Sequence, residues 1–280
     1  MNKILCVFLG LLAFRAAPAQ TQMDCCAPSA TESFAMLASD RQFVLSHPEP
    51  GRFHFHSQNG KQISFPAADG TEAYGWEIVS KTPTQNYLLV IHEWWGLNDY
   101  IKQESENLWN ALGPVNVIAV DLYDKKVATT REDAAKYIQG VKTERAESII
   151  KGVLALAGPN ARIYTIGWCF GGGWSLQATL LAGNQAAGCV MFYGMPEKDL
   201  QKLQGLHADV LGLFASKDKY INPAIVDEFA SNMKKAGKTL IVKSFDADHG
   251  FANPSAPSFN PEARQEAWKT AIAFLKDRLE

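Results

Sequence analysis

The sequence has no long block of like charge and no apolar run near the ~20 residues that a bilayer-spanning helix needs. Its 27 basic and 29 acidic side chains are mixed along the chain, so no surface suited to nucleic-acid backbones is visible. Internal repeats and low-complexity blocks are also missing. We therefore expect no nucleic-acid partner and no stable membrane insertion. The 280 residues, 47% of them apolar, fit one large domain.

The N-terminus has the features of an export signal. Lys3 precedes the apolar run Ile4–Phe14, and Ala17-Pro18-Ala19 has the small-x-small form of a signal-peptidase site. A membrane anchor is the alternative, but the apolar run is too short for one. We predict a signal peptide over residues 1–19, cleavage after Ala19, and export to a bacterial periplasm or the medium.

Cysteine is scarce, with five in the chain. Cys6 would leave with the signal, and Cys25 and Cys26 lie near the mature N-terminus, where the sequence leaves open whether they form a disulfide. Cys189 lies in an apolar run and is interpreted as a small buried hydrophobe. Cys169 stands in a different context, described below.

The chain divides into a weakly periodic arm, residues 20–50, rich in Ala, Ser and Pro, and a domain over residues 51–280. We expect the arm to cover one side of the domain. Strand-like alternation appears at Arg52–His56, at Gln62–Phe65 and at Ala73–Val79, with Asn-Gly and Asp-Gly turns between them. These stretches predict an antiparallel hairpin at a sheet edge.

From Tyr87 onward, short apolar runs alternate with helical patterns, which predicts an α/β fold with a mostly parallel sheet and helices on both faces. The expected strands are Tyr87–His92, Val115–Asp121, Ile163–Trp168, Gly188–Tyr193, Val210–Ala215 and Thr239–Phe245. Helical stretches are expected to begin near Asn98, Arg131, Gly172 and Pro223, with a last helix over Pro261–Leu279.

The motif Gly-x-Cys-x-Gly lies at 167–171, between a predicted strand and a predicted helix. That context places Cys169 on a tight turn at the strand's carboxyl end, and small residues two places either side allow close backbone approach. A thiol at a helix N-terminus is favoured as thiolate, the reactive form. The backbone N–H of Phe170 can bind the oxyanion formed when a carbonyl is attacked.

Two later strand ends carry candidate partners for Cys169. In hydrolases with such a turn, an acid and then a histidine follow the nucleophile along the chain. Here Asp218 follows one predicted strand and His249 follows the next. His249 can take or share the thiol proton, and Asp218 can hold the imidazole in the required tautomer.

These residues, taken together, resemble the dienelactone hydrolase family of the α/β-hydrolase superfamily, from about Tyr87 to the C-terminus. The matching motifs are His92-Glu93-Trp94-Trp95-Gly96-Leu97-Asn98, Asp121-Leu122-Tyr123, Gly167-Trp168-Cys169-Phe170-Gly171-Gly172, Asp218 and His249-Gly250-Phe251. The resemblance implies hydrolysis of a small ester or lactone without a cofactor.

The resemblance also implies roles for two residues after the first central strand. A glutamate at the position of Glu93 contacts the resting thiol in that family, and like-charge repulsion keeps the sulfur protonated until substrate rearranges the glutamate. The backbone N–H of Trp94 would be a second oxyanion donor by the same analogy.

Two positions depart from the family pattern. Its dienelactone-cleaving members hold the substrate carboxylate with two arginines, where this chain has Lys125 and Asn253. Lys125 can supply a point charge, but neither side chain offers a bidentate fork. We therefore expect a substrate other than dienelactone, an uncharged one being favoured, against apolar walls that include Trp95 and Trp168.

Two other functions could be assigned to these residues. In the first, Cys169 is a non-catalytic redox or sensor thiol that exchanges with Cys25 and Cys26, although this needs neither histidine nor aspartate. In the second, His54, His56, His92 and Glu93 hold a metal, but that set has no fixed third ligand, and we expect no metal. The oligomeric expectation is a monomer or small homo-oligomer.

Overall fold

A computed structural model describes residues 28–279 of the chain. The predicted signal peptide and Cys25-Cys26 lie outside the described residues, so both remain predictions.

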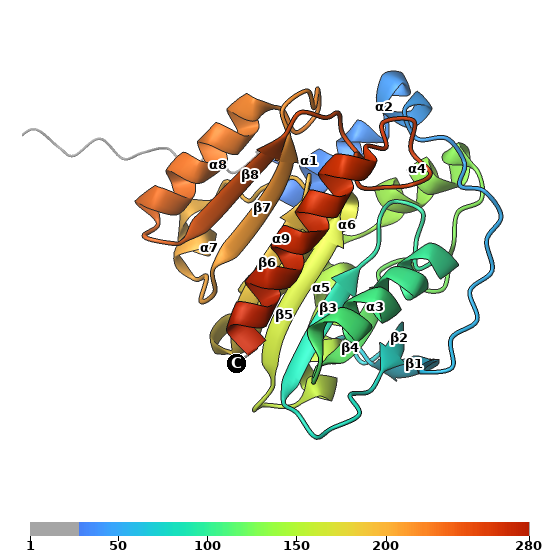
Figure 1. Ribbon diagram of the computed structural model, residues 1–280, viewed down its shortest axis with the longest axis vertical. Helices are drawn as coiled ribbons and strands as arrows, with labels where there is room; N and C mark the ends of the chain where they lie inside the picture. The colour runs from blue at the N-terminus through green and yellow to red at the C-terminus, as the bar shows by residue number, and fades with distance from the viewer. Residues whose placement is uncertain (1–27, 280) are drawn as a thin grey trace, which may run out of the picture.

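One eight-stranded sheet forms the centre of the described chain. Its strands lie in the spatial order β1 (Gly60–Pro66), β2 (Glu72–Ile78), β4 (Asn116–Asp121), β3 (Asn86–Ile91), β5 (Arg162–Trp168), β6 (Ala186–Phe192), β7 (Val210–Ala215) and β8 (Leu240–Phe245) (Figure 1). β1 pairs antiparallel with β2, β2 pairs antiparallel with β4, and the other neighbours are parallel. The predicted mostly parallel sheet with a hairpin at its edge is confirmed.

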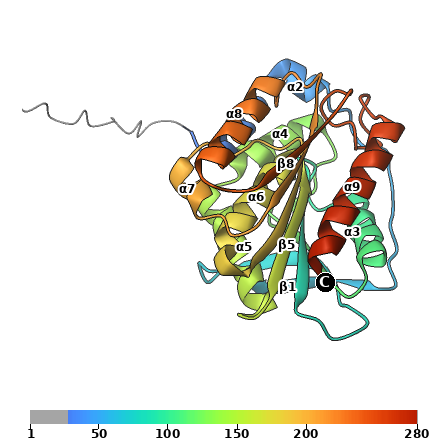
Figure 2. The same cartoon turned by 60° about the vertical axis from the view of Figure 1, so that its left-hand side comes forward.

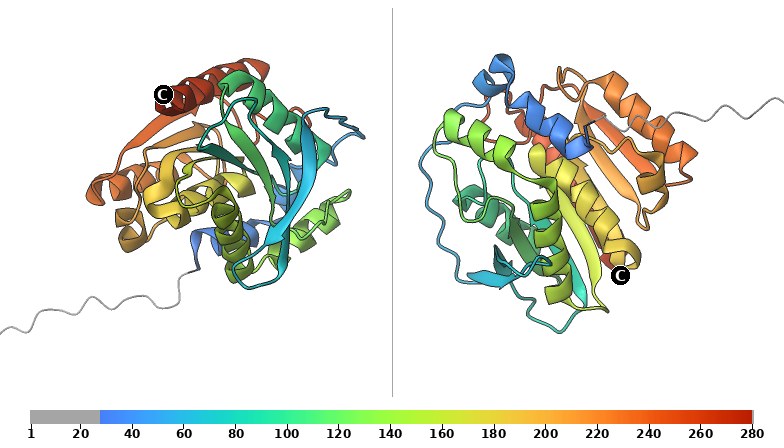
Figure 3. Two further views of the ribbon diagram at one scale, coloured as in Figure 1. Left: turned by 90° about the horizontal axis from the view of Figure 1, so that it is seen from below. Right: turned by 180° about the vertical axis from the view of Figure 1, so that it is seen from behind.

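Helices cover both faces of the sheet (Figure 2). On one face lie α3 (Asp99–Leu112) and α9 (Pro261–Leu279), and on the other lie α5 (Thr143–Ala157), α6 (Phe170–Ala182) and α8 (Pro223–Lys235). The remaining elements are α4 (Arg131–Gly140), α7 (Leu200–Gln204), the 3-10 turn η1 (Gly183–Gln185), and the arm helices α1 (Ala30–Leu37) and α2 (Arg41–Leu45). Seen from behind, α1 crosses α6 (Figure 3).

Local sequence explains where several helices begin. The side chain of Asn98 caps α3 by accepting from the N–H of Ile101. Pro223 occupies the first turn of α8, where a missing N–H costs nothing, and Asn222 caps that helix. No helix among residues 28–279 is long and apolar enough to cross a bilayer.

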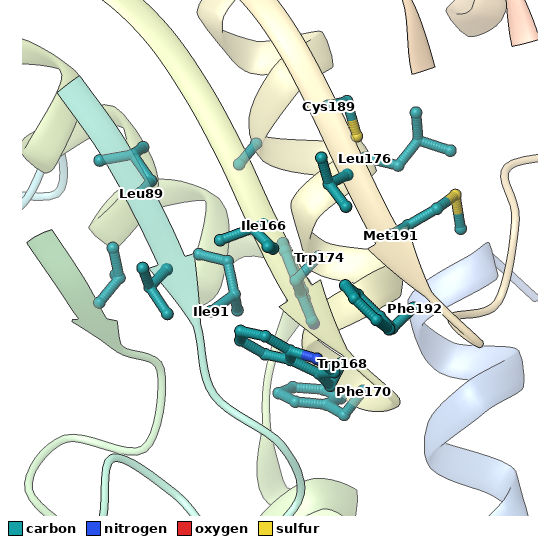
Figure 4. Close-up of a cluster of buried hydrophobic side chains, with 14 of the residues drawn as sticks. Leu89, Ile91, Ile166, Trp168, Phe170, Trp174, Leu176, Cys189, Met191 and Phe192 are labelled. Atoms are coloured by element: carbon teal, nitrogen blue, oxygen red, sulfur yellow. The ribbon is translucent and has the colours of Figure 1, made fainter. Parts of the chain in front are cut away.

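The central strands are buried because helices cover both of their faces. All six residues of β4 and of β7 are buried. Near the carboxyl end of β5, Trp168 stacks on Phe192 with ring centroids 5.4 Å apart, and both rings are buried (Figure 4). This packing makes the end of β5 a rigid support for the residue that follows it.

One sequence expectation was wrong. Arg52–His56 is not a strand, because Phe53 stacks on Tyr100 and Phe55 packs against Trp76 while their neighbours face solvent. That packing produces the alternation without a hydrogen-bonded neighbour strand. The helix predicted to begin near Arg131 is confirmed as α4, and the separate helix α5, after Val141-Lys142, was not predicted.

Candidate active site

Cys169 lies on the sharp turn between β5 and α6. Its φ of 58° is in the left-handed region, which few residues other than glycine adopt. A Cβ at Gly167 would lie 2.1 Å from the Gly171 carbonyl oxygen, and one at Gly171 would lie 2.3 Å from that of Ile91. Both glycines are therefore required by close backbone approach, as the Gly-x-Cys-x-Gly pattern indicated.

Cys169, His249 and Asp218 form a continuous chain of contacts. His249 Nε2 lies 3.4 Å from Cys169 Sγ, and His249 Nδ1 donates to Asp218 Oδ2 at 2.7 Å. The three residues follow β5, β8 and β7, whose carboxyl ends share one edge of the sheet. All three side chains are buried.

Backbone amides hold the Asp218 carboxylate in place. Its Oδ1 accepts from the N–H of Tyr220 at 2.8 Å and from that of Ile221 at 3.0 Å, which leaves Oδ2 for His249. Burial opposes ionisation of Asp218, but His249 and these N–H groups outweigh it and lower the pKa of the carboxyl. Asp218 is thus an anion that fixes the histidine tautomer.

Burial and the neighbouring charges act on both the Cys169 thiol and the His249 imidazole, and a Cys169 thiolate favours the protonated imidazole. Burial raises the pKa of the Cys169 thiol, His249 opposes this, and Glu93 adds to it. Burial disfavours the charged form of His249, but Asp218 and Cys169 outweigh it and raise the pKa of His249 to about 10. A proton taken from the sulfur is therefore well held on the imidazole.

Glu93 follows β3 and faces the same cluster. Its Oε2 accepts from Asn253 Nδ2 at 2.6 Å. Burial raises the pKa of Glu93 to about 7, with His249 and Asn253 acting against it. Asn253 thus binds a protein carboxylate here.

One backbone N–H group borders the sulfur. Phe170 is the first residue of α6, and its N–H lowers the pKa of the Cys169 thiol. Trp94 lies in the loop after β3. Within residues 28–279, the backbone N–H of Trp94 donates to no protein acceptor. The Trp94 N–H is therefore free to donate to another acceptor.

A pocket opens beside Glu93. Trp95, Trp168 and Asn253 line it, so the two tryptophans expected to form apolar walls lie together there. Lys125 is elsewhere: it is exposed, and its Nζ lies 3.7 Å from the centre of the Tyr74 ring on β2. The structure does not bring Lys125 to this pocket.

The N-terminal arm contributes residues that the sequence reasoning missed. The Phe43 ring packs 5.7 Å from Trp94 and 5.9 Å from His249, measured between centroids. His47 lies 5.8 Å from His249 by the same measure, and burial lowers the pKa of His47 to about 4. No motif marks either residue, because their role comes from where the arm folds back.

The four residues considered as metal ligands do not come together. His54 and His56 are exposed. His92 contacts the Glu93 carbonyl oxygen through Nδ1 and accepts from the N–H of Leu122 through Nε2, so both ring nitrogens are used. A metal could be held by three or more histidine, cysteine or carboxylate side chains that lie close together. Among residues 28–279, one such group is present, and it consists of His47, Cys169 and His249.

Comparison with known proteins places this geometry in a family. The model of the Dienelactone hydrolase family matches residues 75–279. A Saccharolobus solfataricus protein named "Putative carboxymethylenebutenolidase" is 29% identical over 232 residues, which cover 68% of this chain and 88% of that protein. The Carboxymethylenebutenolidase of Pseudomonas sp. (strain P51) is 25% identical over 159 residues, covering 55% of this chain and 66% of that one.

A solved structure supports the fold. The dienelactone hydrolase-like promiscuous phosphotriesterase from metagenomic libraries superposes with a TM-score of 0.68 at 18% identity, covering 79% of this chain and all of that one. The fold is thus that of the α/β-hydrolases, and the chain belongs to the dienelactone hydrolase family, whose members are hydrolases of lactone or ester bonds.

Proposed function

We propose that this protein cleaves a small ester or lactone with Cys169 as nucleophile, His249 as general base and acid, and Asp218 as the residue that orients His249. The observation that carries the proposal is the contact chain from Sγ to Nε2 and from Nδ1 to the aspartate. A cysteine on a strained strand-to-helix turn, an imidazole and a carboxylate in this order are the parts that acyl transfer needs.

The proposed reaction has two halves. His249 accepts the thiol proton as Cys169 Sγ attacks the carbonyl carbon, and the N–H groups of Phe170 and Trp94 bind the oxyanion. Collapse of the tetrahedral intermediate breaks the ester bond, and His249 returns the proton to the leaving alkoxide or enolate. A water molecule, deprotonated by His249, then cleaves the thioester and releases the acid.

Glu93 would act as the control on the thiol. Its charge adds to burial in raising the pKa of Cys169, so a change in its position or protonation on substrate binding would release that effect. Its own pKa of about 7 means that it can bind a proton near neutrality.

Two walls of the pocket favour an uncharged substrate. Trp95 and Trp168 offer apolar walls. Asn253 is engaged by Glu93, and the Lys125 ammonium lies over Tyr74, so neither is set to pair with a substrate carboxylate. We expect faster hydrolysis of uncharged short esters and lactones than of matched carboxylated ones, and no cofactor requirement.

The proposed setting is outside the cytoplasm. We expect export with cleavage after Ala19. The N-terminus supports this with Lys3, an apolar run and the motif Ala17-Pro18-Ala19. Fractionation of cells expressing the full chain, with N-terminal sequencing of the product, checks this. An uncleaved product in the cytosolic fraction would contradict it.

Hydrolysis of p-nitrophenyl acetate tests the mechanism. We expect a burst of p-nitrophenol near one equivalent per protein if deacylation is slow, and Cys169→Ala and His249→Ala should each lower turnover by roughly 10³-fold or more. Cys189→Ala is the matched control, since Cys189 is a buried β6 cysteine in the core, and it should retain turnover. No turnover by a folded protein whose Cys169 still reacts with a thiol label would favour the sensor reading.

A further inference from the structure

Three potential metal ligands meet at the nucleophile. A ring nitrogen of His47, a ring nitrogen of His249 and the Cys169 sulfur all lie within 4.8 Å of one another, and all three residues are buried. They come from the arm after α2, from the loop after β8 and from the turn after β5. The triad chemistry uses two of them and leaves His47 without a part.

Hydrogen bonds orient both imidazoles for ligation. His249 Nδ1 donates to Asp218 Oδ2, and His47 Nδ1 donates to the Phe43 carbonyl oxygen, each at 2.7 Å. Each ring therefore keeps Nε2 as its unprotonated nitrogen when neutral. Metal-binding histidines in proteins show this arrangement, with the second nitrogen donating to a carboxylate or a backbone carbonyl.

The distances and charges suit a small soft cation. Tetrahedral zinc, with bonds of ~2.0 Å to nitrogen and ~2.3 Å to sulfur, separates those two ligands by about 3.5 Å. His249 Nε2 and Cys169 Sγ are 3.4 Å apart. His47 would have to approach by roughly 1 Å, because its separation from the others reaches up to the 4.8 Å limit. The Cys169 thiolate and Asp218 would together balance two positive charges.

From this geometry we infer that the protein has an inhibitory zinc site in which Cys169 Sγ, His249 Nε2 and His47 Nε2 bind one Zn²⁺, with water in the fourth position. The ion displaces the thiol proton, and any proton on His249 Nε2, into solvent, and no oxidation occurs. Hydrolysis and zinc binding exclude each other, because both need the same sulfur.

Direct metal binding tests the site without relying on activity. Co²⁺ added to the metal-free protein should give a thiolate-to-cobalt absorption band, and Zn²⁺ should displace it. His47→Asn is the decisive variant, because its side-chain amide can still donate to the Phe43 carbonyl but lacks a nitrogen at the Nε2 position. It should weaken Zn²⁺ binding by at least ~10-fold, whereas Cys169→Ala should abolish the band.

His54→Asn is the matched control, since His54 is exposed and its Nδ1 lies 3.9 Å from Asp99 Oδ2, away from the sulfur. It should bind both metals as the unchanged protein does. Equal Zn²⁺ affinity in His47→Asn and His54→Asn, with both folded by circular dichroism, would overturn the proposal. So would cobalt binding without a thiolate band.

Activity gives a second readout. Micromolar Zn²⁺ should inhibit p-nitrophenyl acetate hydrolysis, EDTA should restore it, and His47→Asn should need at least ~10-fold more zinc for the same inhibition. Inhibition that is equal in the unchanged protein and in His47→Asn would contradict the site. If the protein hydrolyses no ester at all, the cobalt spectrum still decides the question.

Discussion

The two sides of the active site are built in different ways. Cys169, Asp218 and His249 follow directly after strands of one hydrogen-bonded sheet. Phe43 and His47 belong to the arm, where α2 has only five residues, and aromatic contacts connect this segment to the domain. The arm also lies outside residues 75–279, which match the family. The sheet edge thus supplies the reacting groups, and the arm supplies a wall and a third ligand.

Loss of the Asp218 charge should have the largest effect on turnover. It changes a group that the sheet positions and leaves the arm unchanged. Asp218→Asn keeps the size of the side chain but favours the wrong imidazole tautomer, so we expect kcat to fall by roughly 10²–10⁴-fold with little change in KM. Steady-state hydrolysis of p-nitrophenyl acetate measures this. Asp246→Asn is the control, because Asp246 is exposed and pairs with Lys217 on the surface. If Asp218→Asn lowered kcat by less than tenfold, the sheet side would not be the side that carries the chemistry.

On the sheet side of the site, the buried Glu93 carboxylate should lower the stability of the folded protein at high pH. Its folded pKa of about 7 exceeds the usual 4.5, so the folded state binds more protons in between, and stability falls as pH rises from about 4.5 to about 7. Glu93→Gln removes this cost. We expect it to be more stable than the unchanged protein by on the order of 2 kcal/mol at pH 8, with the gain lost near pH 4.5.

Urea unfolding at the two pH values measures the Glu93 effect. Glu144→Gln serves as the control, because Glu144 is exposed in the first turn of α5, and it should shift stability by no more than a few tenths of a kcal/mol. A Glu93→Gln gain that is equal at both pH values would contradict the assigned cause.

A change on the arm side should affect binding more than chemistry. Phe43→Leu keeps apolar volume but loses the ring contacts with Trp94 and His249, so we expect KM to rise by roughly fivefold, about 1 kcal/mol, with kcat within twofold. Phe34→Leu is the matched arm control, because Phe34 packs on Phe170 and Phe43. A large loss of kcat in Phe43→Leu would show that the arm takes part in the chemistry.

The smallest effect is expected at Lys125. Because its ammonium lies over the exposed face of β2 and outside the pocket, Lys125→Gln should change kcat/KM by less than about twofold for charged and uncharged esters alike. Comparison of one acetate ester with one succinate half-ester checks this. A selective loss with the charged ester would return Lys125 to the substrate site.

Features of the site that depend on local backbone conformation could be predicted from the sequence. The Gly-x-Cys-x-Gly pattern indicated the turn at Cys169, because both glycines are forced by close backbone approach within a few residues. Asp218 and His249 could be predicted at the same edge because parallel strands end on one side of a sheet. Prediction from the sequence failed at Arg52–His56, where alternation reflected separate aromatic contacts.

The sequence by itself determined the strand rhythm, the order of cysteine, aspartate and histidine, and the family, since each follows from residue spacing along the chain. Only the tertiary structure decided that His47 and Phe43 reach the nucleophile, that Asn253 holds Glu93, and that Lys125 turns to Tyr74. These contacts join segments far apart in sequence, and packing rather than local pattern selects them.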